Sequence, residues 1–165
     1  VIALVHGAAI GGGVGLVAAA DIALAAEGTV FSLSEVRLGI LPSVISPYVL
    51  RAIGPRQARD LFLTGDRFDA REAHRIGLVH GVVPPGELES AGRKKVDSLL
   101  SSGPEAVGVA KRLIEEVMGK SPEEAVELTA RTIAERRASD EAKEGLTAFL
   151  EKRAPSWAAE KKSKV

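Results

Sequence analysis

The sequence contains no cysteine. Disulfide bonds, thiolate nucleophiles and zinc sites built from cysteine are therefore excluded, and the composition suits a reducing compartment. An excess of charge of either sign is also absent, because 22 Lys and Arg residues balance 22 Asp and Glu residues. This balance gives no reason to expect nucleic acid or an anionic membrane surface as a partner.

The pattern of a membrane span or a secretory leader is missing as well. The apolar opening is interrupted by His6, by three glycines and by Asp21, and it lacks a basic leader. We therefore expect a cytoplasmic protein with no membrane contact. Methionine occurs only once, at Met118, and the chain begins with Val1 inside an apolar run. These two features predict a fragment or a processed chain.

Two parts of different pattern follow each other along the chain. Up to Pro85, short β-rich runs alternate with turns and short helical patterns, whereas from residue 86 onward every apolar pattern has helical spacing. We therefore predict an α/β part over residues 1–85 and an all-helical part over residues 86–165. The stretch "SPEE" is a capping box, in which Ser121 caps a helix and Glu124 reaches back.

The α/β part is expected to consist of short elements. Strands are predicted in "VIALV" (1–5), "DIALAAEG" (21–28), "TVFSL" (29–33) and "LVHGVV" (78–83). Helices are predicted over 13–20, 46–53, 55–63 and 68–77. The stretch "RLGILPSVISP" (37–47) is expected to be a loop, because its glycine and two prolines interrupt regular structure.

Three consecutive glycines, 11–13, separate the first apolar run from a run of small residues. Glycine loses the most backbone freedom on folding, so such a run indicates that bare backbone is needed. Close packing of a helix on a strand is one explanation. A dinucleotide site is a second, since Gly7 completes the spacing G-x-x-x-G-x-G of short-chain dehydrogenases. Their Tyr-x-x-x-Lys motif is missing, because Ala52 stands four residues after Tyr48, the only tyrosine.

An oxyanion hole is the third explanation. Backbone N–H groups at a helix start stabilise the negative charge that a thioester oxygen gains in an enolate, and glycines let the substrate come close. Such a site also needs a carboxylate that moves the proton at the neighbouring carbon. Glu35 in "FSLSEVRLGILP" is the candidate.

Three blocks in order then resemble the enoyl-CoA hydratase/isomerase (crotonase) superfamily. The first family block is G-x-A-x-G-G-G with a later Leu and Asp-Ile, matched by Gly7, Ala9, Gly11, Gly12, Gly13, Leu16, Asp21 and Ile22. The second is F-x-x-x-E-x-x-x-G-x-x-P, matched by Phe31, Glu35, Gly39 and Pro42. The third is "ARDLFLTGDRFDAREAHRIGLVHGVVP" (58–84). The resemblance covers essentially the whole chain.

The resemblance implies a fold and a set of partners. The fold would be α/β, with a crotonase-like core of ββα superhelix turns over 1–85 and a helical region over 86–165 that covers the active site and forms a homotrimer or hexamer. The chain would be the C-terminal half to two-thirds of such a subunit, without the early strands and the second oxyanion N–H group. The substrate would be an acyl-CoA thioester, so coenzyme A enters as part of the substrate and no cofactor or metal is expected.

The resemblance also implies roles for individual residues. Gly12 would donate its N–H group to the thioester oxygen, and Glu35 would be the catalytic acid and base. Five further residues would line the substrate: Gly11, Gly13, Gly15, Pro42 and Ser43.

Two departures from the family pattern guide the choice of reaction. The second glutamate of family hydratases would fall at position 15, where this chain has glycine. The usual glycine-rich loop after Pro42 is replaced by "SVISPY" (43–48), which is similar to the bacterial branch of methylglutaconyl-CoA hydratases of leucine breakdown. We therefore expect a hydratase or lyase with Glu35 as its principal acid and base, in which Ser43 or Ser46 holds water or a second substrate carboxylate. An enoyl-CoA isomerase that uses Glu35 alone and a non-catalytic assembly remnant remain the alternatives.

Overall fold

The computed structural model describes residues 1–159, which form two compact units. The first unit is Val1–Lys94, and the second holds the described residues from Lys95 onward. The functional division expected between residues 85 and 86 stays a prediction. Each unit is described by itself below.

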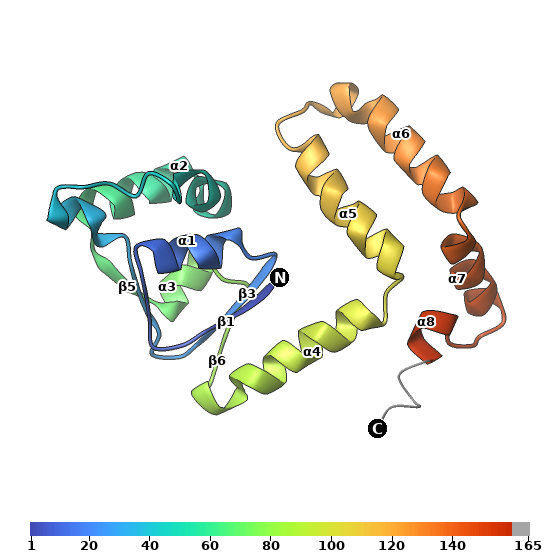
Figure 1. Ribbon diagram of the computed structural model, residues 1–165, viewed down its shortest axis with the longest axis horizontal. Coiled ribbons are helices and arrows are strands. Elements are labelled where there is room, and N and C mark those ends of the chain that lie inside the picture. Colours follow the sequence, from blue (N-terminus) through green and yellow to red (C-terminus); the bar gives the residue numbers. More distant parts are fainter. Residues whose placement is uncertain (160–165) are drawn as a thin grey trace. The chain divides into compact units, whose positions relative to one another are not determined.

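Two three-stranded sheets form the centre of the first unit (Figure 1). The first sheet has the strand order β1-β3-β6 and is parallel throughout. The second has the order β2-β4-β5, with β2 parallel and β5 antiparallel to β4. The strands are β1 (Ile2–Val5), β2 (Ala8–Ile10), β3 (Ile22–Ala26), β4 (Val30–Ser32), β5 (Arg67–Asp69) and β6 (Gly81–Val83).

The first four strands alternate between the two sheets, and the chain passes from β1 to β2 and from β3 to β4 at a glycine. Gly7 lies between β1 and β2 with φ of 70°, and Gly28 lies between β3 and β4 with φ of 82°. Residues with a side chain rarely adopt these positive φ angles, so glycine is suited to both of these turns. After β2, the helix α1 (Gly12–Ala19) leads back, and β3 then pairs with β1 through Ile2 and Ile22. The result is a ββα turn followed by a second pair of strands, which confirms the expected α/β superhelix.

The helices of the first unit pack on these sheets. They are α1, the 3₁₀ turn η1 (Ser34–Leu38), α2 (Ser46–Thr64) and α3 (Ala70–Arg75). Helix α1 lies between the strands and α2 (Figure 1). Gly54 interrupts α2 with φ of 71° and ψ of 165°, which confirms the prediction of two helical segments on either side of this residue. In the core, the fully buried ring of Phe31 stacks on Phe68 with 5.5 Å between the ring centroids.

Several short elements differ from the prediction. Strand β2 was not expected, because three residues flanked by glycine carry almost no periodicity and are held by pairing with β4. Residues 67–69 form β5, so the helix expected from 68 starts only at Ala70, where Asp69 caps it. The strand expected over 78–83 is limited to β6, since the N–H groups of Leu78 and Val79 donate to the carbonyl of Ala73 in the turn after α3. The expected loop over 37–47 includes the end of η1.

The second unit is helical, as predicted. Helix α4 (Leu88–Leu100), preceded by the 3₁₀ turn η2 (Pro85–Glu87), leads into it. Its other helices are α5 (Pro104–Val117), α6 (Pro122–Ala138), α7 (Asp140–Leu150) and α8 (Ser156–Ala159). The capping box is confirmed at the start of α6, where Glu124 N–H donates to Ser121 Oγ and Ser121 N–H donates to Glu124 Oε2.

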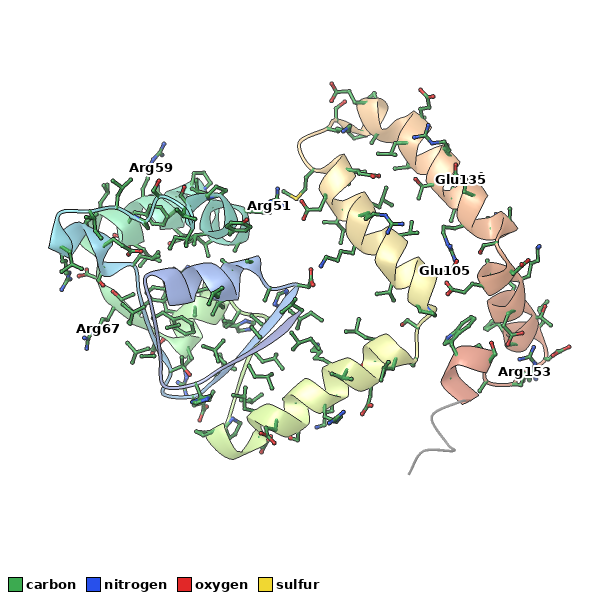
Figure 2. The ribbon with its side chains drawn as sticks, viewed as in Figure 1. Arg51, Arg59, Arg67, Glu105, Glu135 and Arg153 are labelled. Atoms are coloured by element: carbon green, nitrogen blue, oxygen red, sulfur yellow. The ribbon has the colours of Figure 1, made fainter. Side chains whose placement is uncertain are left out.

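Two charged side chains fix the helix ends in this unit. Glu141 accepts the N–H groups of Glu105 and Ala106 at the start of α5, and Arg136 donates to both Glu105 and Glu141. Figure 2 labels Glu105. A similar set of hydrogen bonds fixes the connection between α7 and α8.

Arg153 donates to both carboxylate oxygens of Glu144, and Ser156 N–H donates to one of them. These hydrogen bonds lower the pKa of Glu144 to about 2, and those from Arg153 contribute most.

Across residues 1–159, the helices are all too short or too polar to cross a membrane.

Candidate active site

The site begins where β2 passes into α1. Gly11 has φ of 54° and ψ of −118°, a conformation that favours glycine. Its N–H group donates to the carbonyl of Ser32 at 2.8 Å, which ties the end of β2 to the end of β4. Its carbonyl accepts the N–H groups of Val14 and Gly15. The start of α1 is therefore fixed by backbone contacts alone.

The next two N–H groups of this helix start have no acceptor. Within residues 1–159, no carbonyl or side-chain oxygen accepts a hydrogen bond from Gly12 N–H or Gly13 N–H. Gly12 is exposed, and a Cβ atom on it would meet nothing within 4 Å. These donors can therefore be reached by an oxygen atom from outside, and the positive end of the helix dipole favours an anionic one.

Glu35 lies directly beside this helix start. It belongs to η1, and its Oε1 atom is 3.2 Å from the position that a Cβ atom on Gly11 would take. A side chain at position 11 would crowd the carboxylate, so the bare Cα of Gly11 allows the close approach. The structure thus brings two predicted residues together that are 24 positions apart in the sequence.

One oxygen of the Glu35 carboxylate has no hydrogen-bond partner among the described residues. This atom, Oε2, is buried. Arg37, two residues further on, does not neutralise it, because Arg37 Nη2 donates to Asp66 Oδ1 at 2.6 Å and Arg37 Nε donates to the carbonyl of Thr64. A buried carboxylate oxygen without a partner is costly, and such atoms are rare in folded proteins. The capacity of Oε2 to accept a hydrogen bond is not used by any described residue.

Gly15 lies one helical turn after Gly12 and is covered by Ile45. A Cβ atom on Gly15 would come within 2.1 Å of Ile45 Cγ2 and within 2.6 Å of Ile45 Cβ. Gly15 is buried, and Ile45 is partly buried against the core. The sequence pointed to the missing carboxylate at position 15 but not to Ile45. The loop "SVISPY" was noticed, whereas its contact with α1 depends on the tertiary fold.

The loop residues predicted to line the substrate are placed as follows. Pro42 is buried, and Ser43 is exposed. The Ser43 carbonyl accepts the N–H and Oγ–H groups of Ser46, so these two serines shape the start of α2. Among the described residues, no hydrogen bond joins Ser43 to Glu35 or to the glycines of α1. Its role toward a substrate stays a prediction.

A small cavity of about 150 Å³ lies on the face of the second sheet opposite Phe31. Residues from all three strands face it in one register row, Ile10, Ser32 and Arg67 (Figure 2 labels Arg67). Neither Gly12 nor Glu35 lines it. The cavity therefore does not include the two predicted catalytic residues.

Two of the three histidines have structural contacts. His80 Nδ1 accepts the N–H group of Ala23, and His74 Nδ1 lies 3.1 Å from the carbonyl of Val79. In the part of the chain that the structure describes, no three His, Asp or Glu side chains are grouped so that they could bind a metal ion.

The chain matches the family model described as enoyl-CoA hydratase/isomerase over residues 1–160. It is 41% identical over 154 residues to the crotonyl-CoA hydratase of Syntrophomonas wolfei, a match that covers 93% of this chain and 59% of that protein. Among solved structures, an enoyl-CoA hydratase from Shewanella pealeana is 44% identical with a TM-score of 0.89, covering 94% of this chain and 58% of that one. A "putative enoyl CoA hydratase/isomerase (crotonase)" from Legionella pneumophila is 48% identical with a TM-score of 0.90. That match covers 94% of this chain and 61% of the Legionella chain. The chain thus spans about three fifths of the length of these relatives.

Proposed function

The chain belongs to the enoyl-CoA hydratase/isomerase family. We propose that it is the part of an acyl-CoA hydratase that contains the catalytic acid and base, Glu35. The reaction is the addition of water across the 2,3 double bond of an enoyl-CoA thioester, or its removal in the reverse direction. The observation that supports this most is the buried, unpaired Oε2 atom of Glu35 beside the free N–H groups of α1. One group can move a proton, and the other can stabilise an oxyanion.

In the proposed reaction, the thioester oxygen accepts the N–H group of Gly12. The oxygen of a water molecule bonds to C3 while the Glu35 carboxylate takes a proton from that water, and the π electrons of the C2–C3 bond move into the thioester enolate. Glu35 then gives its proton to C2, and the carbonyl and the carboxylate are restored. Preorganised donors at the enolate oxygen are usually the largest contribution to such a reaction, on the order of a hundredfold or more in rate for each donor.

The preferred substrate is of the methylglutaconyl-CoA type, as in leucine breakdown. Two features support this: position 15 is glycine, and the loop "SVISPY" follows Pro42. In this proposal Ser43 binds the distal carboxylate of the substrate. Ser43→Ala should then weaken activity on a glutaconyl-type thioester more than activity on crotonyl-CoA, and equal losses on both would exclude this role.

An isomerase is the second candidate, and the single carboxylate favours it. A shift of the double bond from C3–C4 to C2–C3 needs one base that takes a proton from C2 and returns it to C4, which Glu35 can do alone. Hydration and isomerisation are distinguished by their products, a 3-hydroxyacyl-CoA or a 2-enoyl-CoA.

We also propose that the chain assembles as a homotrimer or hexamer through its helical unit. Large apolar side chains stand exposed on the helices α5–α7: Ile114, Val126, Ile133, Leu146, Phe149 and Leu150. Phe149 is 79% and Leu150 is 78% exposed, which is unusual for neighbouring large apolar residues on a protein that stays monomeric. Light scattering after size exclusion should give three or six chains per particle, and Leu150→Glu should lower that number.

The proposed activity is tested on two proteins, the 165-residue chain and a hybrid. In the hybrid, the chain replaces the matching part of the Shewanella hydratase, so that every residue discussed above comes from this chain. Crotonyl-CoA, methylglutaconyl-CoA and a 3-enoyl-CoA are offered, and products are identified by mass spectrometry and chromatography. We expect hydration by the hybrid, with methylglutaconyl-CoA preferred.

Glu35→Gln is the decisive variant, since it keeps the shape and removes the base. Loss of a general acid–base group typically lowers the rate by about 10² to 10⁴-fold. Glu27→Gln is the matched control, because Glu27 is an exposed carboxylate at the turn after β3. Turnover by the hybrid that survives in Glu35→Gln would refute the assignment. A hybrid that binds acyl-CoA but converts none of the three substrates would favour the non-catalytic assembly remnant.

A further inference from the structure

Ile45 occupies the place on α1 that a second catalytic side chain would need. The position of a Cβ atom on Gly15 lies 2.1 Å from Ile45 Cγ2, far below any normal contact between carbon atoms. A change of the Ile45 rotamer can move Cγ2 away. It cannot move Ile45 Cβ, which lies 2.6 Å from the same position and is fixed by the backbone. Any side chain at position 15 therefore requires a shift of the loop itself.

The loop is held firmly at this point. Ile45 is the residue before α2, and its carbonyl accepts the N–H groups of Tyr48 and Val49 in the first turn of that helix. Val49 is fully buried, and the Ile45 side chain packs against the core. A movement of Ile45 would therefore disturb the start of α2, where Pro47 further restricts the backbone.

Gly15 and Ile45 are also placed to affect the reaction. Residues three apart share one face of a helix, so Gly15 lies on the same face of α1 as Gly12. The Cγ2 methyl group of Ile45 thus lies about one helical turn from the Gly12 N–H group, which donates to the thioester oxygen in the proposed reaction. It contributes an apolar wall that can neither activate nor hold a water molecule.

We propose that Ile45 is a positioning residue that keeps this wall of the site free of a second carboxylate, so that Glu35 performs both proton transfers. The proposal rests on the proposed function for its catalytic part, whereas the interlock of Gly15 and Ile45 is a property of the fold. The identity of residue 45, and not of residue 15 alone, then decides whether the site works with one carboxylate or two.

The interlock is tested by the melting temperature of the 165-residue chain. Gly15→Ala should lower it in the wild-type background and also in the Ile45→Ala background, because alanine keeps the Cβ atom at 2.6 Å. In the Ile45→Gly background both clashing atoms are gone. Gly15→Ala should there raise the melting temperature, since alanine favours a helix more than glycine does.

Gly13→Ala is the matched control for these melting curves. A Cβ atom on Gly13 would meet only Ala9 Cβ, at an ordinary 3.8 Å, so the change should have the same sign in all three backgrounds. An unchanged melting temperature for Gly15→Ala in the wild-type background would overturn the interlock. So would an equal loss in the Ile45→Gly background.

The catalytic part is tested with Gly15→Glu in the hybrid described above. Combined with Ile45→Gly, it should increase crotonyl-CoA hydration at least tenfold over Gly15→Glu alone and add a second ionisation to the acidic limb of the pH–rate profile. The same gain with Ile45 intact would overturn the proposal, as would no gain with Ile45 removed. If neither the wild type nor any variant hydrates a substrate while the melting curves behave as expected, the proposed function fails and the interlock stands.

Discussion

Replacing Glu35 with glutamine should stabilise the fold while it removes the proposed catalytic base. The Oε2 atom of Glu35 is buried without a hydrogen bond, and no cation in residues 1–159 is paired with this carboxylate. The folded state therefore holds one carboxylate oxygen that has lost its water and gained no partner. Glutamine has the same shape and no charge, so this cost falls.

The size of the gain follows from the cost of an unsatisfied buried polar atom, about 1–3 kcal/mol. Glutamine keeps one oxygen and adds an NH₂ group, which also prefer partners, so we expect only the lower part of this range, about 1 kcal/mol. For a chain of this length, that corresponds to a rise in melting temperature of about 2–4 °C.

Urea denaturation at pH 7 measures the gain directly, followed by far-UV circular dichroism. The midpoint should move to higher urea with an unchanged slope, which identifies a change in stability and not in the unfolded state. Glu27→Gln should leave the midpoint within about 0.5 kcal/mol of the wild type, as exposed substitutions usually do. The same two variants serve in the activity assay, so stability and turnover are compared in one pair.

A loss of stability in Glu35→Gln would refute this reasoning. It would mean that the carboxylate is needed by the fold, and that its position beside Gly11 has a structural cause. A gain in stability with loss of turnover is the pattern of a group placed for its chemistry.

Three further outcomes are expected. Glu141→Ala should cost about 2 kcal/mol of unfolding free energy, because two N–H groups at the start of α5 lose their acceptor, and urea denaturation should show it. The pKa of Glu144, lowered by Arg153 from 4.5 to about 2, means that this contact stabilises the folded state above pH 4.5 and is lost as the pH falls towards 2. Fluorescence of Trp157, the only tryptophan, should report that transition, and Glu144→Gln should abolish it. Phe31→Ala should cost about 3–5 kcal/mol, seen in the urea midpoint, because its ring is fully buried.

Much of the fold could be predicted where one local signal decides the structure. Gly54 followed by Pro55 divides α2, and Ser121 with Glu124 starts α6, because these residues act on the backbone beside them. Strands β2 and β5 could not be predicted, since each has three residues and exists only because β4 lies between them. Pairing partners distant in the sequence determine such strands.

The candidate site shows the same division. The glycines of α1 were singled out by their spacing and Glu35 by the resemblance to the family, and the structure places Gly11 and Glu35 against each other. The sequence could not show that the neighbouring Arg37 turns away to Asp66, which leaves the carboxylate without an ion pair. A contact between side chains two residues apart depends on what each meets in the folded protein.

In the proposed function, the number of carboxylates in the site depends on the loop before α2 as well as on α1. A glycine at position 15 explains why a second carboxylate is absent, but it does not explain why one cannot simply be introduced. The 2.6 Å between Ile45 Cβ and the Cβ position of Gly15 supplies that reason, because only a backbone movement can relieve it. Since the Ile45 carbonyl is bonded into the first turn of α2, such a movement would have to include that helix start. A two-carboxylate site in this fold thus requires a change in the loop before it can use a glutamate on α1.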